Sequence, residues 1–179
     1  MACITKLANT IAYNCDSGAT GIVSAVIINK ADIASFTVTG TKDVSALTLV
    51  SGAKAYKIDT VKRSLVVSTA LKVNDGAPNA FTHTATLTDM NTTTSGAHLE
   101  ISKAMSNGSF VIISRRPGGS DAAVSGLYYG MSATAFDQNS HENGAWTTIT
   151  LETPENVIGE DNLRMSSKDY SALYEAAVG

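Results

Sequence analysis

The residue types that support catalysis or metal binding are sparse and widely separated in this sequence. The chain contains three histidines, at positions His83, His98 and His141. None of them belongs to an HExxH-type pair or to another spacing at which two histidines share a metal ion. Glu155, Glu160 and Asp161 lie near the C-terminus, where charged loop residues exposed to solvent are the ordinary explanation. We therefore predict no metal site.

Nucleophile and phosphate-binding motifs are missing as well. The sequence has no GxSxG stretch, and Gly119-Ser120-Asp121 follows a turn rather than joining a strand to a helix. It has neither a GxxxxGKS/T loop nor a GxGxxG stretch that opens a helix. Cys3 and Cys15 match neither a CxxC redox pair nor zinc-ligand spacing, so we expect buried free thiols. The prediction is a protein that is not an enzyme and needs no cofactor.

The charge of the chain argues against binding to polyanions. Its net charge is -3, and the adjacent cationic pairs are Lys62-Arg63 and Arg115-Arg116. A firm grip on nucleic acid or on an anionic membrane needs larger clusters of lysine and arginine. No apolar run approaches the roughly 20 residues that span a bilayer, and no secretory apolar segment is visible. We expect no membrane partner, and synthesis in the cytoplasm of a bacterial host.

The elements implied by the pattern are mostly short strands. Segments rich in β-branched residues recur about every ten residues, with turn residues between them, which is typical of a sandwich or barrel. The predicted strands are 20–29, 33–39, 44–50, 55–61, 65–73, 81–87, 110–114, 124–131 and 145–151. The run at 110–114 is continuously apolar, which indicates a central strand buried on both faces.

Two helices complete the predicted fold. A short flanking helix is expected at 97–106, ended by Asn107-Gly108, and a C-terminal helix follows a capping box that begins at Ser166. The fold class is thus mainly β (α+β): an antiparallel β-sandwich or partly rolled barrel, in a single domain over 1–179. Its predicted core includes Phe36, Val38, Ile112, Leu127, Trp146 and Ile149.

The stretch 74–96 differs from the rest and is predicted to be an assembly arm. It opens with the turn residues Asn74-Asp75-Gly76, is rich in threonine and carries few large apolar side chains. Such a segment cannot offset its own conformational entropy, so we expect it to become ordered only against a neighbouring subunit. The predicted subunit interface comprises Phe81, Leu87, Met90, Arg115 and Arg116.

Three stretches resemble one group of viral proteins. They are the opening residues MACITKLANTIAYNCDSGATGI, the run FDQNSHENGAW at 136–146, and the strand at 147–151 with Thr153-Pro154-Glu155 after it. Together they are similar to tail-tube-like or major tail-type structural proteins of Bacteroides phages and prophages. The resemblance implies a homo-oligomer in the virion, in which stacked rings contact other virion proteins and conduct DNA without specific binding.

Other functions remain open at this point. A neck, ring or capsid-decoration protein of the same virion would have a similar sequence. A carbohydrate-binding or adhesive β-sandwich module of a gut bacterium is the alternative from another class, but the aromatic content of 6% supplies few sugar-stacking side chains. A hydrolase of sandwich fold would need a polar constellation in a cleft, which the sequence does not indicate.

Overall fold

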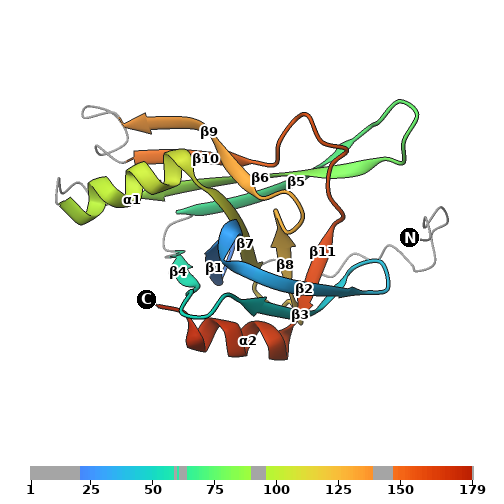
Figure 1. Ribbon diagram of the computed structural model, residues 1–179, viewed down its shortest axis with the longest axis horizontal. Helices are drawn as coiled ribbons and strands as arrows, with labels where there is room; N and C mark the ends of the chain where they lie inside the picture. Colours follow the sequence, from blue (N-terminus) through green and yellow to red (C-terminus); the bar gives the residue numbers. More distant parts are fainter. Residues whose placement is uncertain (1–20, 59, 61–63, 90–95, 139–146, 179) are drawn as a thin grey trace.

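The computed structural model describes residues 21–58, 60, 64–89, 96–138 and 147–178, which form a mainly β fold with two helices (Figure 1). The strands are β1 (Ser24–Asn29), β2 (Ile33–Thr39), β3 (Asp43–Leu49), β4 (Tyr56–Ile58), β5 (Leu65–Lys72), β6 (Ala80–Asp89), β7 (Ser109–Arg115), β8 (Asp121–Ser125), β9 (Met131–Gln138), β10 (Thr147–Glu152) and β11 (Leu163–Ser166). A 3-10 turn, η2 (Lys30–Asp32), joins β1 to β2, and the helices are α1 (Gly96–Asn107) and α2 (Ser167–Ala176).

The described strands form one sheet that does not close. Its order is β2-β3-β11-β8-β7-β9-β10-β6-β5, and β1 adds a further pairing to β7 and to the short strand β4. In Figure 1 the β5, β6, β9 and β10 end forms an upper layer beside α1, and the β2 and β3 end forms a lower layer above α2. The predicted mainly β, sandwich-like fold with a flanking and a C-terminal helix is confirmed.

One pairing departs from the antiparallel pattern that the sequence suggested. Strand β11 runs parallel to β3, with Arg164 beside Asp43 and Met165 beside Val44. The chain reaches this position after crossing from the other end of the sheet, so the neighbouring strands are far apart in sequence. Such a long connection can place two strands in the same direction, whereas a short hairpin cannot.

Strand β7 explains why the sheet has two cores. Its residues alternate between the faces, so Val111 and Ile113 belong to one buried cluster and Phe110 and Ile112 to the other. Both faces of a strand in this position are covered, which requires the continuous apolar run seen in the sequence. The prediction of a fully buried central strand at 110–114 is confirmed.

The predicted core residues fall into three groups. Ile112, Leu127 and Ile149 are buried, as predicted. Phe36 and Val38 are only half-buried against the first cluster, because β2 is the last strand of the sheet. Trp146 lies outside the described residues.

The single strand predicted at 124–131 is wrong. Strand β8 ends at Ser125, and β9 begins at Met131 after a turn at 126–130. Gly126 has a φ of 80°, and a Cβ there would stand 2.8 Å from the carbonyl oxygen of Phe110. The turn therefore depends on a glycine that both bends the chain and lets it approach β7.

The predicted arm at 74–96 is also corrected over most of its described length. Strand β6 pairs with β5 on one side and with β10 on the other, so Ala80–Asp89 has its own partners within the subunit. The backbone hydrogen bonds of these ladders, rather than large side chains, order this threonine-rich stretch. Residues 73–79 form the tip of the β5–β6 hairpin, which projects from the upper layer in Figure 1.

Both predicted helices are present. Helix α1 ends at Asn107, where the ring of Phe110 would lie 2.4 Å from a Cβ at Gly108. Helix α2 begins after Ser166, whose hydroxyl oxygen accepts a hydrogen bond from the Asp169 amide at 3.2 Å. This is the N-terminal part of the capping arrangement that the sequence predicted.

Candidate functional site

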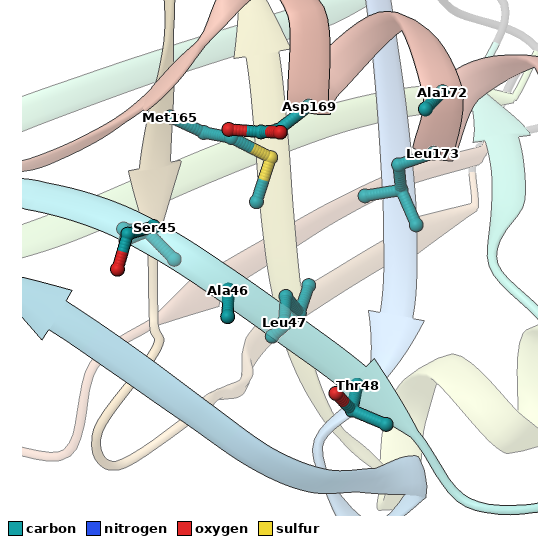
Figure 2. A pocket seen from close by; sticks show the side chains of 9 residues that line it. Ser45, Ala46, Leu47, Thr48, Met165, Asp169, Ala172 and Leu173 are labelled. Carbon is teal, nitrogen blue, oxygen red and sulfur yellow. The ribbon is translucent and has the colours of Figure 1, made fainter.

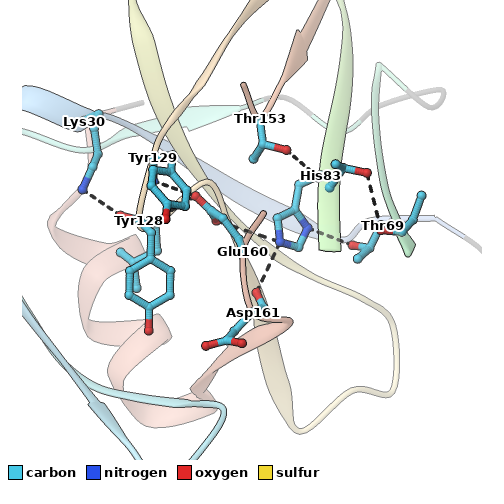
Figure 3. Close-up of polar contacts among 11 residues, drawn as sticks. Lys30, Thr69, His83, Tyr128, Tyr129, Thr153, Glu160 and Asp161 are labelled. Atoms are coloured by element: carbon cyan, nitrogen blue, oxygen red, sulfur yellow. Dashed lines mark hydrogen bonds and ion pairs between the residues drawn. The ribbon is translucent and has the colours of Figure 1, made fainter. Parts of the chain in front are cut away.

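A buried polar cluster forms where β6, the turn at 126–130 and the segment after β10 meet (Figure 3). Glu160 and His83 lie at its centre, each with 1% of its side chain exposed. Oε1 of Glu160 accepts hydrogen bonds from the amides of Tyr128 at 3.1 Å and Tyr129 at 2.7 Å. Its other oxygen, Oε2, is 4.0 Å from Nε2 of His83 and accepts no hydrogen bond from the described residues.

His83 connects this cluster to the neighbouring strands. Its Nδ1 is 3.0 Å from the hydroxyl of Thr69 on β5, and its Nε2 is 3.4 Å from the carbonyl oxygen of Asp161. Its backbone amide donates to the hydroxyl of Thr153 at 3.0 Å. The backbone of Phe81 exchanges hydrogen bonds with that of Glu160, both at 2.8 Å. The segment from Thr153 to Asp161 is thus fastened along β6.

Burial governs the electrostatics of the cluster. It raises the pKa of Glu160, although the backbone amides of the 126–129 turn oppose this by stabilising the carboxylate. Burial lowers the pKa of His83, and it lowers the pKa of Lys30 against the opposing attraction of Glu160. Lys30 donates from Nζ to the carbonyl oxygen of Leu127 at 2.7 Å.

The cluster fastens the 126–130 turn and the segment after β10 to β6. A catalytic acid or base must reach the reacting atom, and both His83 and Glu160 are buried in this structure. Within the part of the chain that the structure describes, no three histidine, cysteine or acidic side chains gather as metal ligands. No described helix is long and apolar enough to cross a membrane.

A shallow groove of about 300 Å³ lies between β3 and α2 (Figure 2). Leu47, Met165 and Leu173 contribute apolar surface to its lining, and Asp169 contributes a carboxylate. That carboxylate already accepts a hydrogen bond from the hydroxyl of Ser166 at 2.7 Å in the helix cap. This carboxylate therefore serves helix α2.

The exposed end of the β5–β6 hairpin offers a more distinctive surface. Nζ of Lys72 donates to the carbonyl oxygen of Glu155 at 2.6 Å, and Nδ2 of Asn74 donates to that of Ile158 at 2.8 Å. These bonds join the end of the hairpin to the 155–158 loop. We call residues 71–79 together with residues 155–158 the hairpin tip. Its exposed apolar side chains are Leu71, Val73 and Ile158, with exposed fractions of 60%, 70% and 57%.

Strand β5, which leads to the hairpin tip, is an edge of the sheet. Among the described strands it pairs with β6 alone, at every position from Leu65 to Lys72 and without a register shift. The opposite edge, β2, has two register shifts against β3, between Ile33 and Ser35 and between Thr37 and Val38. Such irregularities protect an edge from further pairing, so β5 is the more accessible edge.

The predicted interface residues do not form one surface. Phe81 lies opposite Leu71 in the hairpin and is half-buried, whereas Leu87 packs against the second core cluster. Arg115 ends β7 beside Ser24, in a different part of the sheet, and Arg116 follows it. Met90 lies outside the described residues.

Sequence reasoning missed the residues that create the hairpin tip. Val73 directly precedes the turn signal Asn74-Asp75-Gly76, so an apolar side chain beside a predicted turn was the available signal. Ile158 carried no such signal, since it joins the hairpin only through the fold.

Comparison with family models, with curated proteins and with solved structures found no match.

Proposed function

We propose that this protein is a self-assembling structural subunit of a phage virion, of the tail-tube type that its sequence resembles. The observation that carries the proposal is strand β5, which is an edge among the described strands and leads to the apolar hairpin tip. In this role the protein is not an enzyme and uses no cofactor. Its partners are further copies of itself and other virion proteins.

The hairpin tip exposes apolar surface to water, which costs free energy. Apolar side chains that are exposed singly are common, but Leu71, Val73 and Ile158 belong to one joined unit. Covering a large aliphatic side chain contributes about 1.5–3 kcal/mol by the hydrophobic effect. An edge strand with unpaired backbone groups adds a template for pairing with another chain. A subunit interface at this place covers the apolar side chains and also pairs the backbone groups of the edge strand.

The charge of the chain is compatible with the passage of DNA. Its 13 lysines and arginines are outnumbered by 16 aspartates and glutamates. Binding strength grows with each phosphate that a protein neutralises, so a surface poor in cations lets DNA move without being held. We propose DNA as a cargo that passes through a ring or tube and is not specifically bound.

The alternative of a carbohydrate-binding or adhesive module receives less support. Exposed aromatic side chains in the described residues include Tyr56, Tyr129 and Phe136. They come from β4, from the turn before β9 and from β9, whereas a sugar-stacking platform needs aromatic rings on one face.

Sedimentation velocity over a range of concentrations tests the proposal. The double variant Val73→Ser and Ile158→Ser should shift the distribution to smaller species while melting like the parent. Ile101→Ser is the matched control, because Ile101 on α1 is exposed to a similar extent, at 58%, but lies outside the hairpin tip.

The outcomes separate the alternatives. A parent protein that stays monomeric at high concentration, alone and with virion partners, would refute self-assembly. Electron micrographs of the assembled parent distinguish tubes from the single rings expected of a neck or ring protein. A species that forms only on capsid shells would indicate a decoration protein.

A further inference from the structure

Within the described residues, one side of the β5 backbone has no strand paired with it. The amide of Thr88 donates to the carbonyl oxygen of Ser64 at 2.7 Å, so position 64 faces β6. Hydrogen-bonding direction alternates along an antiparallel ladder, and therefore positions 66, 68, 70 and 72 also face β6. The amides and carbonyls that point to the open edge are those of Leu65, Val67, Thr69 and Leu71.

The β6–β10 ladder supports this assignment independently. The amide of Thr153 donates to the carbonyl oxygen of His83 at 3.0 Å, which directs the odd-numbered residues of β6 toward β10. The even-numbered residues of β6 are left to bond β5. They lie opposite the even-numbered residues of β5, such as Thr84 opposite Ser68.

We infer that two copies of this chain join through their β5 strands, antiparallel, about a twofold axis that passes beside Ser68. The inference deepens the proposed function and rests on its claim of self-association, because it names the first contact between copies. It makes the sheets of two subunits continuous across the β5 edge.

The register follows from the positions of the unpaired groups. With the axis at Ser68, Leu65 lies opposite Leu71 of the second copy and Val67 lies opposite Thr69. Each unpaired residue of the edge then meets another unpaired residue, as an antiparallel ladder requires. A shift by two residues in either direction leaves Leu65 or Leu71 without a partner inside the strand.

The side chains fit the same register. On one face Leu71, which is 60% exposed, lies opposite Leu65, which is buried in the core of its own subunit; on the other face Val66, which is 51% exposed, lies opposite Ala70. No charged residue lies between Leu65 and Leu71, so the twofold axis brings no like charges together. Lys72 is already held by the carbonyl oxygens of Glu155 and Val157.

The twofold symmetry limits how many subunits this contact can join. A strand that pairs with its own copy about a twofold axis closes after two subunits. Pairing of β5 with β2 of the next subunit would instead meet an edge with two register shifts. A ring or tube is therefore assembled from dimers through a second surface, for which Val73 and Ile158 of the hairpin tip remain exposed.

Cysteine cross-linking tests the register. Residues that face each other in the non-hydrogen-bonded position of an antiparallel ladder have Cα atoms about 4.5 Å apart, within the usual disulfide range. Ser68→Cys should therefore form a covalent dimer under mild oxidation, in a chain whose Cys3 and Cys15 are replaced by serine. Ala70→Cys is the control, because two such residues would be roughly 13 Å apart along the strands.

A second variant tests the same contact without a covalent bond. Ser68→Lys places two ammonium groups opposite each other at the axis and should raise the dimer dissociation constant at least about tenfold. Ser68 is exposed in the subunit, so the melting temperature of the monomer should not change.

The results distinguish this inference from the proposed function. Cross-linking of Ser68→Cys but not of Ala70→Cys, with loss of the dimer in Ser68→Lys, supports the β5 pairing. Assemblies that form without cross-linking at position 68, or that tolerate Ser68→Lys, overturn the pairing and leave self-assembly standing. Equal cross-linking at both positions overturns the register. A parent that is monomeric throughout overturns both claims.

Discussion

Replacing Glu160 by alanine should destabilise the protein strongly, because one buried carboxylate holds the 126–130 turn against β6. Its Oε1 accepts hydrogen bonds from the amides of Tyr128 and Tyr129. The accepting side chain is 1% exposed, and its hydrogen bonds to the two amides are part-buried. Glu160→Ala removes the acceptor from both donors.

The magnitude follows from the number of donors. Leaving one buried donor unsatisfied costs about 1–3 kcal/mol, and the cavity left by the side chain adds to that cost. We expect a loss of about 4 kcal/mol in the free energy of unfolding, in the range seen when a buried polar network is broken. For a chain of this size, that corresponds to a melting temperature lower by roughly 8–16 °C.

Glu160→Gln separates the loss of the acceptor from the loss of the charge. The glutamine oxygen can accept the same hydrogen bonds, and the neutral amide avoids the cost of burying a carboxylate. Its melting temperature at neutral pH should stay close to that of the parent, within about 1 kcal/mol in stability.

Thermal and urea unfolding of the parent and both Glu160 variants provides the measurement. If Glu160→Ala melts like the parent, the carboxylate does not hold the turn, and the reasoning is refuted. If the alanine and glutamine variants lose equal stability, the charge matters more than the acceptor, which would contradict the direction of the pKa shift of Glu160.

Three further predictions concern other parts of the fold. The pKa of His83 is lower in the folded protein than its value of 6.5 in the unfolded chain. His83 therefore adds to the stability of the fold above pH 6.5, and this stability is lost as the pH falls toward the pKa of the folded protein. The pKa of Glu160 is higher in the folded protein than its value of 4.5 in the unfolded chain. Glu160 therefore adds to the stability of the fold below pH 4.5, and this stability is lost as the pH rises through the pKa of the folded protein. Melting curves of His83→Gln should therefore fall less steeply than those of the parent as the pH is lowered from 6.5; an unchanged slope would exclude His83. Gly126→Ala should cost more than about 2 kcal/mol through its positive φ and the contact with Phe110, against about 1–2 kcal/mol for Gly118→Ala, which has open space around it. Equal losses in urea unfolding would show that the contact is unimportant. Ser166→Ala should cost about 1 kcal/mol by removing the cap of α2, and an unchanged urea midpoint would contradict that role.

Local sequence patterns predicted the elements whose stability is decided nearby. The apolar run at 110–114 implied a strand covered on both faces, and β7 has both faces buried. The capping residues and apolar spacing after Ser166 predicted α2, because a helix cap and a helix face involve residues only three or four positions apart.

Patterns failed where distant strands supply the stabilising contacts. The threonine-rich stretch at 80–89 lacks large side chains, yet β5 and β10 complete its hydrogen bonds from both sides. The segment 124–131 has the composition of one strand, but the approach to Phe110 and the carboxylate of Glu160 stabilise a turn at 126–130.

The candidate sites show the same division. Glu160 belonged to a group of acidic residues that the sequence assigned to solvent, whereas the structure buries it beside His83. The two residues are separated by most of the C-terminal half of the chain, so their pairing has no sequence signature. The 155–158 loop likewise reaches the hairpin only through the hydrogen bonds from the side chains of Lys72 and Asn74.

The sequence by itself determined that the protein is mainly β, that its central strand is buried and that a capped helix begins after Ser166. These features depend on side-chain periodicity and on bonds between near neighbours, which composition and spacing record directly. Only the tertiary structure decided the strand order, the buried Glu160–His83 cluster and which edge of the sheet stays open. Each of these depends on contacts between segments far apart in the chain, and the free energy of such contacts is set by the packing of the whole fold.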